Sequence, residues 1–133
     1  DNQSLSKKGV LRGMHFQKPP KAQAKCIRVI HGEIFDVIVD IRKSSPTFGQ
    51  WTGFTLNSKN NHMLFIPEWF AHGFLVLSEL AIIHYKCSNT YSPEHEVCLK
   101  FDDPTVNIGW PTTEFPKLSN KDRLGLTLDE VAL

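Results

Sequence analysis

The strongest constraint on the fold is the segment Ile-Phe-Asp-Val-Ile-Val-Asp-Ile at residues 34–41. Every second residue from Phe35 to Ile41 is apolar, whereas the alternate positions include Asp36 and Asp40. Successive side chains of a β-strand point to opposite faces, so this period predicts a strand with one wholly apolar face. We therefore expect residues 34–41 to belong to a sheet that covers a hydrophobic core on one side.

Similar short segments recur along the chain, separated by clusters of turn-forming residues. His31-Gly32 lies between an alternating segment at 25–29 and the strand at 34–41, which predicts a hairpin with Gly32 at a positive φ. Many short strands joined by turns are typical of a sandwich or barrel rather than a parallel α/β sheet. The further segments expected as strands are residues 50–56, 63–66, 74–77 and 80–86.

We interpret residues 1–133 as one all-β domain, a jelly-roll β barrel, because the chain is long enough for a single core and short for two. The tail differs from the rest. Ser119-Asn120-Lys121-Asp122 matches a capping box and is followed by spaced leucines, which predicts a short C-terminal helix or turn.

Composition argues against several classes of function. The formal net charge of +1 does not favour nucleic acid or an anionic membrane surface as a partner. No apolar segment approaches the length of a membrane span. Three cysteines without Cys-x-x-Cys spacing argue against a zinc ribbon or a redox pair, and they favour reduced thiols in a cytoplasmic protein.

One polar cluster combines Leu-Arg-Gly-Met-His-Phe-Gln at residues 11–17 with Gln23-Ala24-Lys25. A guanidinium and an ammonium beside an imidazole can bind a diphosphate and stabilise negative charge that develops on a substrate. Solvated loop charges, with a histidine that caps a strand end, are the alternative. Composition alone favours that alternative.

Two further candidates are His72 and Tyr85. His72 follows Pro67 at a spacing that resembles the second cupin motif, although a histidine between apolar residues is more often a hydrogen-bonded core residue. Tyr85 shares a strand face with Ile83, so it points into the barrel if Ile83 lies in the core. A buried tyrosine usually has a packing role, and that alternative stays open.

The sequence does not predict a metal centre. Metal-binding cupins typically present His-x-His with a downstream Glu, whereas Met14-His15-Phe16 offers a single histidine. A pair formed by His15 and His72 would lack the usual third and fourth ligands. We expect no metal at this site.

These clusters belong to longer segments at residues 9–17, 32–37, 40–51, 66–74, 103–111 and 118–122. In their order and spacing the segments resemble the dTDP-4-dehydrorhamnose 3,5-epimerase family, which has a cupin fold, and the resemblance covers essentially the whole chain. It implies inversion of C3 and C5 of dTDP-4-dehydro-6-deoxy-D-glucose to give dTDP-4-dehydro-L-rhamnose. Both carbons are α to the C4 ketone, so the reaction needs a base, an acid on the opposite face and a positive environment for the enolate oxygen, but no cofactor.

The resemblance also implies roles for individual residues. His15 would be the base, Asp122 the carboxylate that orients its imidazole, and Tyr85 the acid on the opposite face. Asp122 has the alternative role of capping-box acid in the tail. The implied substrate-binding residues are Arg12, Gln23, Lys25, His72 and Asn2, with Lys25 nearest the enolate oxygen.

The family is dimeric, so the resemblance implies a homodimer as well as a nucleotide-sugar substrate. Asp1-Asn2 match the last part of an N-terminal segment with which family members hold the nucleotide across the subunit boundary. Weaker nucleotide binding is expected where the contacts of that segment are missing.

Two alternatives remain open at this stage. One is a related enzyme of nucleotide-linked 4-keto sugars, either an epimerase that acts at a single carbon or a ketoisomerase. The other is a truncated, non-catalytic cupin that binds a sugar nucleotide.

Overall fold

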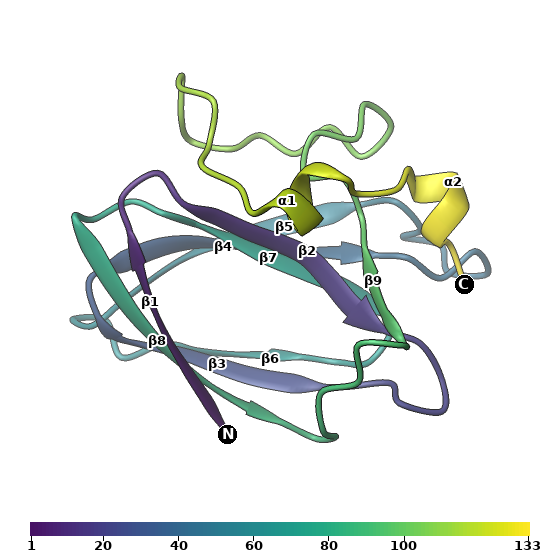
Figure 1. Cartoon of the computed structure of the whole chain (residues 1–133), viewed down its shortest axis with the longest axis horizontal. Helices are drawn as coiled ribbons and strands as arrows, with labels where there is room; N and C mark the ends of the chain where they lie inside the picture. The colour runs from purple at the N-terminus through teal and green to yellow at the C-terminus, as the bar shows by residue number, and fades with distance from the viewer.

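The structure, a computed structural model, describes residues 1–133 and contains nine strands and two helices (Figure 1). The all-β prediction is confirmed. Each helix has four residues, and neither is long or apolar enough to cross a membrane. In chain order the elements are β1 (Asn2–Lys7), β2 (Leu11–Gln17), β3 (Lys25–His31), β4 (Glu33–Asp40), β5 (Trp51–Asn57), β6 (Met63–Ile66), β7 (Phe70–Val76), β8 (Leu80–Cys87), β9 (Glu96–Cys98), α1 (Asn120–Arg123) and α2 (Leu128–Val131).

The strands form two antiparallel sheets that face each other. A four-stranded sheet has the order β1-β8-β3-β6, and a five-stranded sheet has the order β5-β4-β7-β2-β9. The chain crosses between the sheets at most connections, which is the arrangement of a jelly roll. In Figure 1 the segment after β9, with both helices, lies over the outer side of the five-stranded sheet.

The predicted hairpin at Gly32 is wrong, although the residue has the expected positive φ of 85°. β3 pairs with β6 and β8, whereas β4 pairs with β5 and β7, so the turn carries the chain from one sheet to the other. A Cβ atom at Gly32 would lie 2.1 Å from the carbonyl oxygen of Leu80. Glycine is therefore required here because the backbone passes very close to the start of β8, and not because β3 and β4 form a hairpin.

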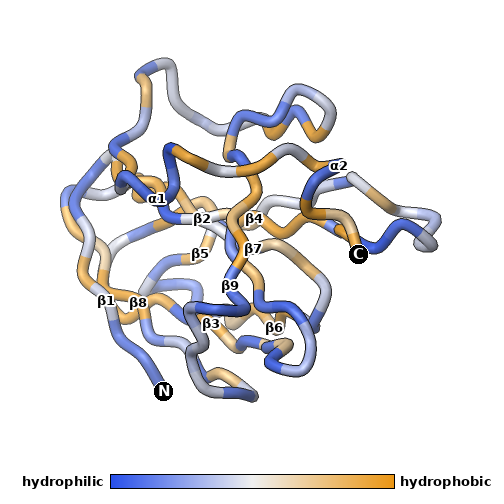
Figure 2. Tube along the Cα trace, turned by 45° about the vertical axis from the view of Figure 1, so that its right-hand side comes forward, coloured by the Kyte–Doolittle hydropathy of each residue, from blue (hydrophilic) through white to orange (hydrophobic).

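Both faces of β4 are buried, not one as predicted. Val37 and Val39 pack beneath the C-terminal segment in a core that includes Val131. Ile34 lies on the opposite face in a second core between the two sheets. Asp36 shares that inner face with Phe74, its partner on β7, and is fully buried. Figure 2 shows the hydrophobic residues concentrated on the strands, while the N-terminal end is hydrophilic.

The predicted C-terminal helix exists and supports the site. Ser119 Oγ accepts a hydrogen bond from the Asp122 N–H at 3.1 Å, which is one half of a capping box. The Asp122 carboxylate does not return to the cap, because it is directed at β2 and accepts from the Gly13 N–H at 3.3 Å. The short helix therefore presents a buried carboxylate to the inner strands.

Candidate active site

A cavity of about 590 Å³ opens between the two sheets near α1, within the size range of small-molecule sites. Every site residue predicted from the sequence lines it, whether it comes from β1, β2, β3, β7, β8, α1 or a loop. The eight residues are Asn2, Arg12, His15, Gln23, Lys25, His72, Tyr85 and Asp122. Their shared location is a structural finding, while their individual roles stay predictions.

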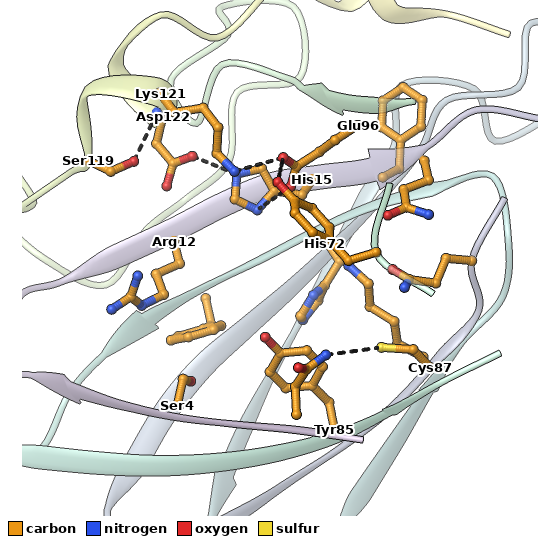
Figure 3. A pocket seen from close by; sticks show the side chains of 17 residues that line it. Ser4, Arg12, His15, His72, Tyr85, Cys87, Glu96, Ser119, Lys121 and Asp122 are labelled. Atoms are coloured by element: carbon orange, nitrogen blue, oxygen red, sulfur yellow. Dashed lines mark hydrogen bonds and ion pairs between the residues drawn. The ribbon is translucent and has the colours of Figure 1, made fainter. Parts of the chain in front are cut away.

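His15 and Asp122 form a close pair on one wall of the cavity (Figure 3). His15 Nε2 lies 2.5 Å from Asp122 Oδ1. Burial raises the pKa of Asp122, but its hydrogen bonds with His15 and with the Gly13 N–H lower it, and the net pKa is lowered. An ionised carboxylate only accepts hydrogen bonds, so Nε2 carries the proton and Nδ1 keeps its lone pair. The pair therefore holds His15 in the tautomer that a base requires.

Tyr85 lies on the opposite wall from His15, as Figure 3 shows. β8, which carries Tyr85, belongs to the four-stranded sheet, whereas β2, which carries His15, belongs to the five-stranded sheet. Ile83 is fully buried and shares the inner face of β8, which confirms the predicted orientation of Tyr85. Burial raises the pKa of Tyr85, so its phenol keeps the proton that an acid must donate.

A second histidine–carboxylate pair lies deeper in the barrel. His72 Nε2 is 2.6 Å from Asp36 Oδ1, and both residues are buried. The other oxygen of the carboxyl group, Asp36 Oδ2, is buried without a hydrogen-bond partner. His72 lies opposite His15 where β2 and β7 pair, so the two imidazoles come from neighbouring strands of one sheet.

Cationic side chains line the same cavity. Arg12 donates from Nε to Ser6 Oγ at 2.9 Å, which fixes the guanidinium and leaves its other N–H groups free for a ligand. Burial lowers the pKa of Lys25, and the nearby groups Cys87, Glu96 and Asp36 offset that effect only in part. The pocket therefore holds a desolvated amine as well as a fixed guanidinium.

Glu96 organises a network that the sequence did not indicate. Its Oε2 accepts from Lys121 Nζ at 2.7 Å and from the Tyr91 hydroxyl at 2.9 Å. Its Oε1 lies 4.0 Å from His15 Nδ1. Burial raises the pKa of Glu96, but the hydrogen bonds from Lys121 and Tyr91 lower it, and the net pKa is lowered. The network ties α1 to β9 beside the catalytic candidate His15.

Comparison with known proteins decides the family. The sequence model described as dTDP-4-dehydrorhamnose 3,5-epimerase matches residues 1–130. The dTDP-4-dehydrorhamnose 3,5-epimerase of Salmonella typhimurium is 52% identical over 133 residues, which are all of this chain and 73% of the relative. The chain belongs to the dTDP-4-dehydrorhamnose 3,5-epimerase family.

Solved structures agree with this assignment and with the cupin fold. A dTDP-6-deoxy-D-glucose-3,5-epimerase from Legionella pneumophila, in complex with dTDP-4-keto-L-rhamnose, superposes with a TM-score of 0.94 at 48% identity, covering 98% of this chain and 69% of that one. A 3'-monoepimerase from Streptomyces bikiniensis, in complex with dTDP-quinovose, gives 0.92 at 35% identity, covering 96% and 65%. The solved structures similar to this chain thus include enzymes named for one centre and for two.

Within this epimerase scaffold, sequence reasoning missed the partner of His72 and the Glu96 network. Asp36 alternates with apolar residues on β4, and a charge in that position usually faces solvent. Glu96 lies on a strand of three residues, which is too short to show a period. Neither residue had a clear signal in the sequence, because only one face of the strand at residues 34–41 was expected to cover a core.

Proposed function

We propose that residues 1–133 form one domain that converts dTDP-4-dehydro-6-deoxy-D-glucose into dTDP-4-dehydro-L-rhamnose by inverting C3 and C5. The observation that carries the proposal is the placement of His15, paired with Asp122, and Tyr85 on opposite walls of one cavity. Inversion requires a proton to leave one face of a carbon and another to arrive at the opposite face. Family membership supplies the substrate class.

The proposed base is His15 Nδ1. Because Nε2 donates to Asp122, Nδ1 accepts the α proton, and the carboxylate then stabilises the imidazolium that forms. The pair of electrons left on carbon delocalises onto the C4 oxygen as an enolate. Tyr85 then donates its phenolic proton from the opposite wall, which gives the inverted centre, and exchange with solvent resets both groups.

The enolate oxygen needs positive charge or hydrogen-bond donors. Lys25 lines the cavity from the sheet that carries Tyr85, and His72 lines it from the sheet that carries His15 and is backed by the buried carboxylate of Asp36. The contact of 2.6 Å between His72 Nε2 and Asp36 Oδ1 fixes the imidazole, and Lys25 brings N–H donors, so we assign His72 and Lys25 to the oxygen. No step of this scheme transfers electrons to a cofactor.

Arg12 and Lys121 are the proposed contacts for the diphosphate, and Asn2 and Gln23 for the polar groups of the nucleotide sugar. Arg12 on β2 and Lys121 on α1 both line the cavity that His15 lines, so the anionic part of the substrate can lie near them while the sugar reaches His15. A guanidinium and an ammonium are the side chains that bind phosphate oxygens most strongly.

Proton NMR of the 4-keto sugar nucleotide with the protein in deuterated water tests this function. We expect the C3 and C5 protons to exchange with deuterium and the signals of the L-rhamno product to appear. Binding of dTDP without exchange at either carbon would instead identify a non-catalytic sugar-nucleotide-binding protein.

The second candidate function is epimerisation at one carbon only. This candidate is supported by the similarity to a 3'-monoepimerase, which shares the fold with a TM-score of 0.92. The same spectra separate the two functions. Exchange at C3 with an intact C5 proton would assign the chain to the single-centre reaction.

We also propose a homodimer built on the outer face of the four-stranded sheet. Exposed apolar side chains lie on all four strands of that sheet, and clustered exposed apolar surface is typical of subunit interfaces. These side chains are Leu5, Ile30, Met63, Phe65 and Leu80.

Sedimentation tests the dimer. Phe65, which is 64% exposed on edge strand β6, is the position to change. We expect Phe65→Lys to sediment as a monomer at a concentration at which the parent chain is a dimer. Phe115→Lys, on an exposed loop away from the sheet, is the matched control. A parent chain that is monomeric at tens of micromolar, the order of magnitude for a weak interface, would contradict the proposal.

For the cellular location we propose the cytoplasm. All three cysteines, Cys26, Cys87 and Cys98, are free, and such thiols are typical of a reducing compartment.

A further inference from the structure

A third potential metal ligand lies against the His15–Asp122 pair. Cys98 Sγ on β9 is 3.8 Å from Asp122 Oδ1, the oxygen that is 2.5 Å from His15 Nε2. The three ligand atoms lie within 4.8 Å of one another, and no other group of three or more His, Cys, Asp or Glu in the chain meets that criterion. Imidazole, thiolate and carboxylate are the ligand types that zinc and similar cations prefer.

Regular structure holds all three ligands in place. His15 and Cys98 are directly opposite each other in the β2–β9 ladder. Asp122 is fixed at its second oxygen by the Gly13 N–H, so Oδ1 is free to face the other two groups. On the far edge of the imidazole, Glu96 Oε1 lies 4.0 Å from Nδ1, where a carboxylate can orient a metal-bound histidine. The site therefore needs little ordering to bind a cation.

A tetrahedral cation would require a small rearrangement of the three ligands. Zinc bonds of about 2.0–2.3 Å place neighbouring ligand atoms about 3.3–3.7 Å apart. The Sγ–Oδ1 separation of 3.8 Å is already close to that value. The His15–Asp122 separation of 2.5 Å must widen, by about 0.8 Å to match those bond lengths. With three protein ligands, the fourth position is left to water.

We propose that His15, Cys98 and Asp122 bind a thiophilic divalent cation such as Zn²⁺ or Cd²⁺, and that the bound cation switches off His15 as a base. Coordination at Nε2 moves the imidazole proton to Nδ1, where the base needs a free lone pair. The Cys98 thiol releases its proton to solvent as the sulfur–metal bond forms, so one proton is released per cation and nothing is oxidised or reduced.

The thiol sets the selectivity of this site. A sulfur ligand favours thiophilic ions such as Zn²⁺ and Cd²⁺, whereas Mg²⁺ and Ca²⁺ prefer sites made only of oxygen ligands. The binding claim is independent of the proposed function, whereas the loss of turnover rests on it.

Binding of Cd²⁺ alone to the purified chain tests the site without an activity assay. We expect one Cd²⁺ per chain in equilibrium dialysis and a thiolate-to-cadmium charge-transfer band in the ultraviolet. Cys98→Ala should abolish the band and weaken binding by at least about 100-fold, since even outer-shell partners of a metal typically contribute about 10–100-fold. Cys98→Ser keeps a polar side chain and serves if the alanine variant does not fold.

Cys26→Ala is the matched control, because this thiol is on β3, outside both the ligand group and the cavity. It should bind Cd²⁺ as the parent chain does. A band that survives Cys98→Ala, or that disappears in Cys26→Ala or Cys87→Ala instead, would overturn the assignment.

The consequence for turnover is tested separately. Cd²⁺ should suppress substrate deuterium exchange, and a chelator should restore it. Cys98→Ala, compared with its own metal-free rate, should need at least about 100-fold more Cd²⁺ for the same loss. Site binding with undiminished exchange would refute the switch and leave the proposed function intact. A chain that shows no exchange even without metal would refute the proposed function, and dialysis would still decide the binding site.

Discussion

Asp122 Oδ1 lies 2.5 Å from His15 Nε2, although 107 positions separate the two residues in the chain. His15 is on β2 of the five-stranded sheet, and Asp122 is on α1, a helix of four residues. The Ser119 cap fixes the helix, and the Gly13 N–H fixes the second carboxylate oxygen. The C-terminal segment therefore determines which nitrogen of His15 is free to act as a base.

Asp122→Asn should lower turnover by roughly 10²–10⁴-fold, the range for loss of a general acid or base. An amide can donate to Nε2, which favours the tautomer with the proton on Nδ1 and removes the free lone pair. Steady-state turnover of the 4-keto substrate is the measurement. Asp129→Asn, an exposed carboxylate on α2, is the control. Equal rates for the two variants would mean that the pair only stabilises the fold.

Asp36→Asn should reduce kcat more than it changes KM. The substitution removes the charge that His72 Nε2 contacts at 2.6 Å. A hydrogen bond to a charged group is worth about 1.5–3 kcal/mol, which corresponds to roughly 10–100-fold in rate. Asp102→Asn, an exposed acid, serves for comparison. An unchanged kcat with a large loss of stability would assign the buried pair to folding alone.

The ionised carboxylate of Asp40 should make the free energy of unfolding depend on pH. Hydrogen bonds from Arg42 first, and then from Ser45 and Thr47, hold the pKa of this carboxyl well below its usual range. A lowered folded-state pKa contributes stability that is present above the unfolded value of about 3.9 and is lost as the pH falls toward the folded value. Asp40→Asn should therefore cost more stability at pH 7 than at pH 3.

Urea unfolding of Asp40→Asn and of the parent chain at both pH values measures that difference. Asp102→Asn should show no such dependence, because its carboxylate is exposed. An equal cost of Asp40→Asn at both pH values would show that the charge of Asp40 does not stabilise the folded state.

Exhaustive chelation should leave turnover unchanged, because the proposed chemistry uses only side chains of the protein. Dialysis against a chelator followed by a rate assay, with metal analysis of the same sample, is the measurement. Stoichiometric metal in the purified chain, together with activity that is lost on its removal and regained on its return, would refute the metal-free scheme.

The sequence predicted strands well where apolar residues alternate and poorly where the inner face is polar. β4 and β8 show the period of two clearly, whereas β1 reads as polar because it lines a cavity with Asn2 and Ser4. The pairing of β4 was predicted wrongly, since a glycine at positive φ serves a hairpin and a crossover between sheets equally well. Local signals fix backbone conformation, but they do not fix which strand lies alongside.

The site residues were predicted together through the family resemblance, not through local pattern. Composition alone favoured solvated charges for the cluster around Arg12 and His15. Asp36 and Glu96 were missed because their functions depend on partners, His72 and Lys121, that only the folded barrel brings near. A charged residue on a strand carries no sign of whether it faces water or another charge.

The most direct test of the central claim is deuterium exchange and inversion measured together for His15→Asn and Tyr85→Phe. His15→Asn should lose both, because no group then removes the α proton. Tyr85→Phe should keep some exchange while inversion falls by roughly 10²–10⁴-fold, because the base can still return a deuteron to its own face. Both variants must first match the parent chain in thermal unfolding. Inversion by Tyr85→Phe at the parental rate would make Tyr85 a packing residue and contradict the assignment of acid and base to opposite walls.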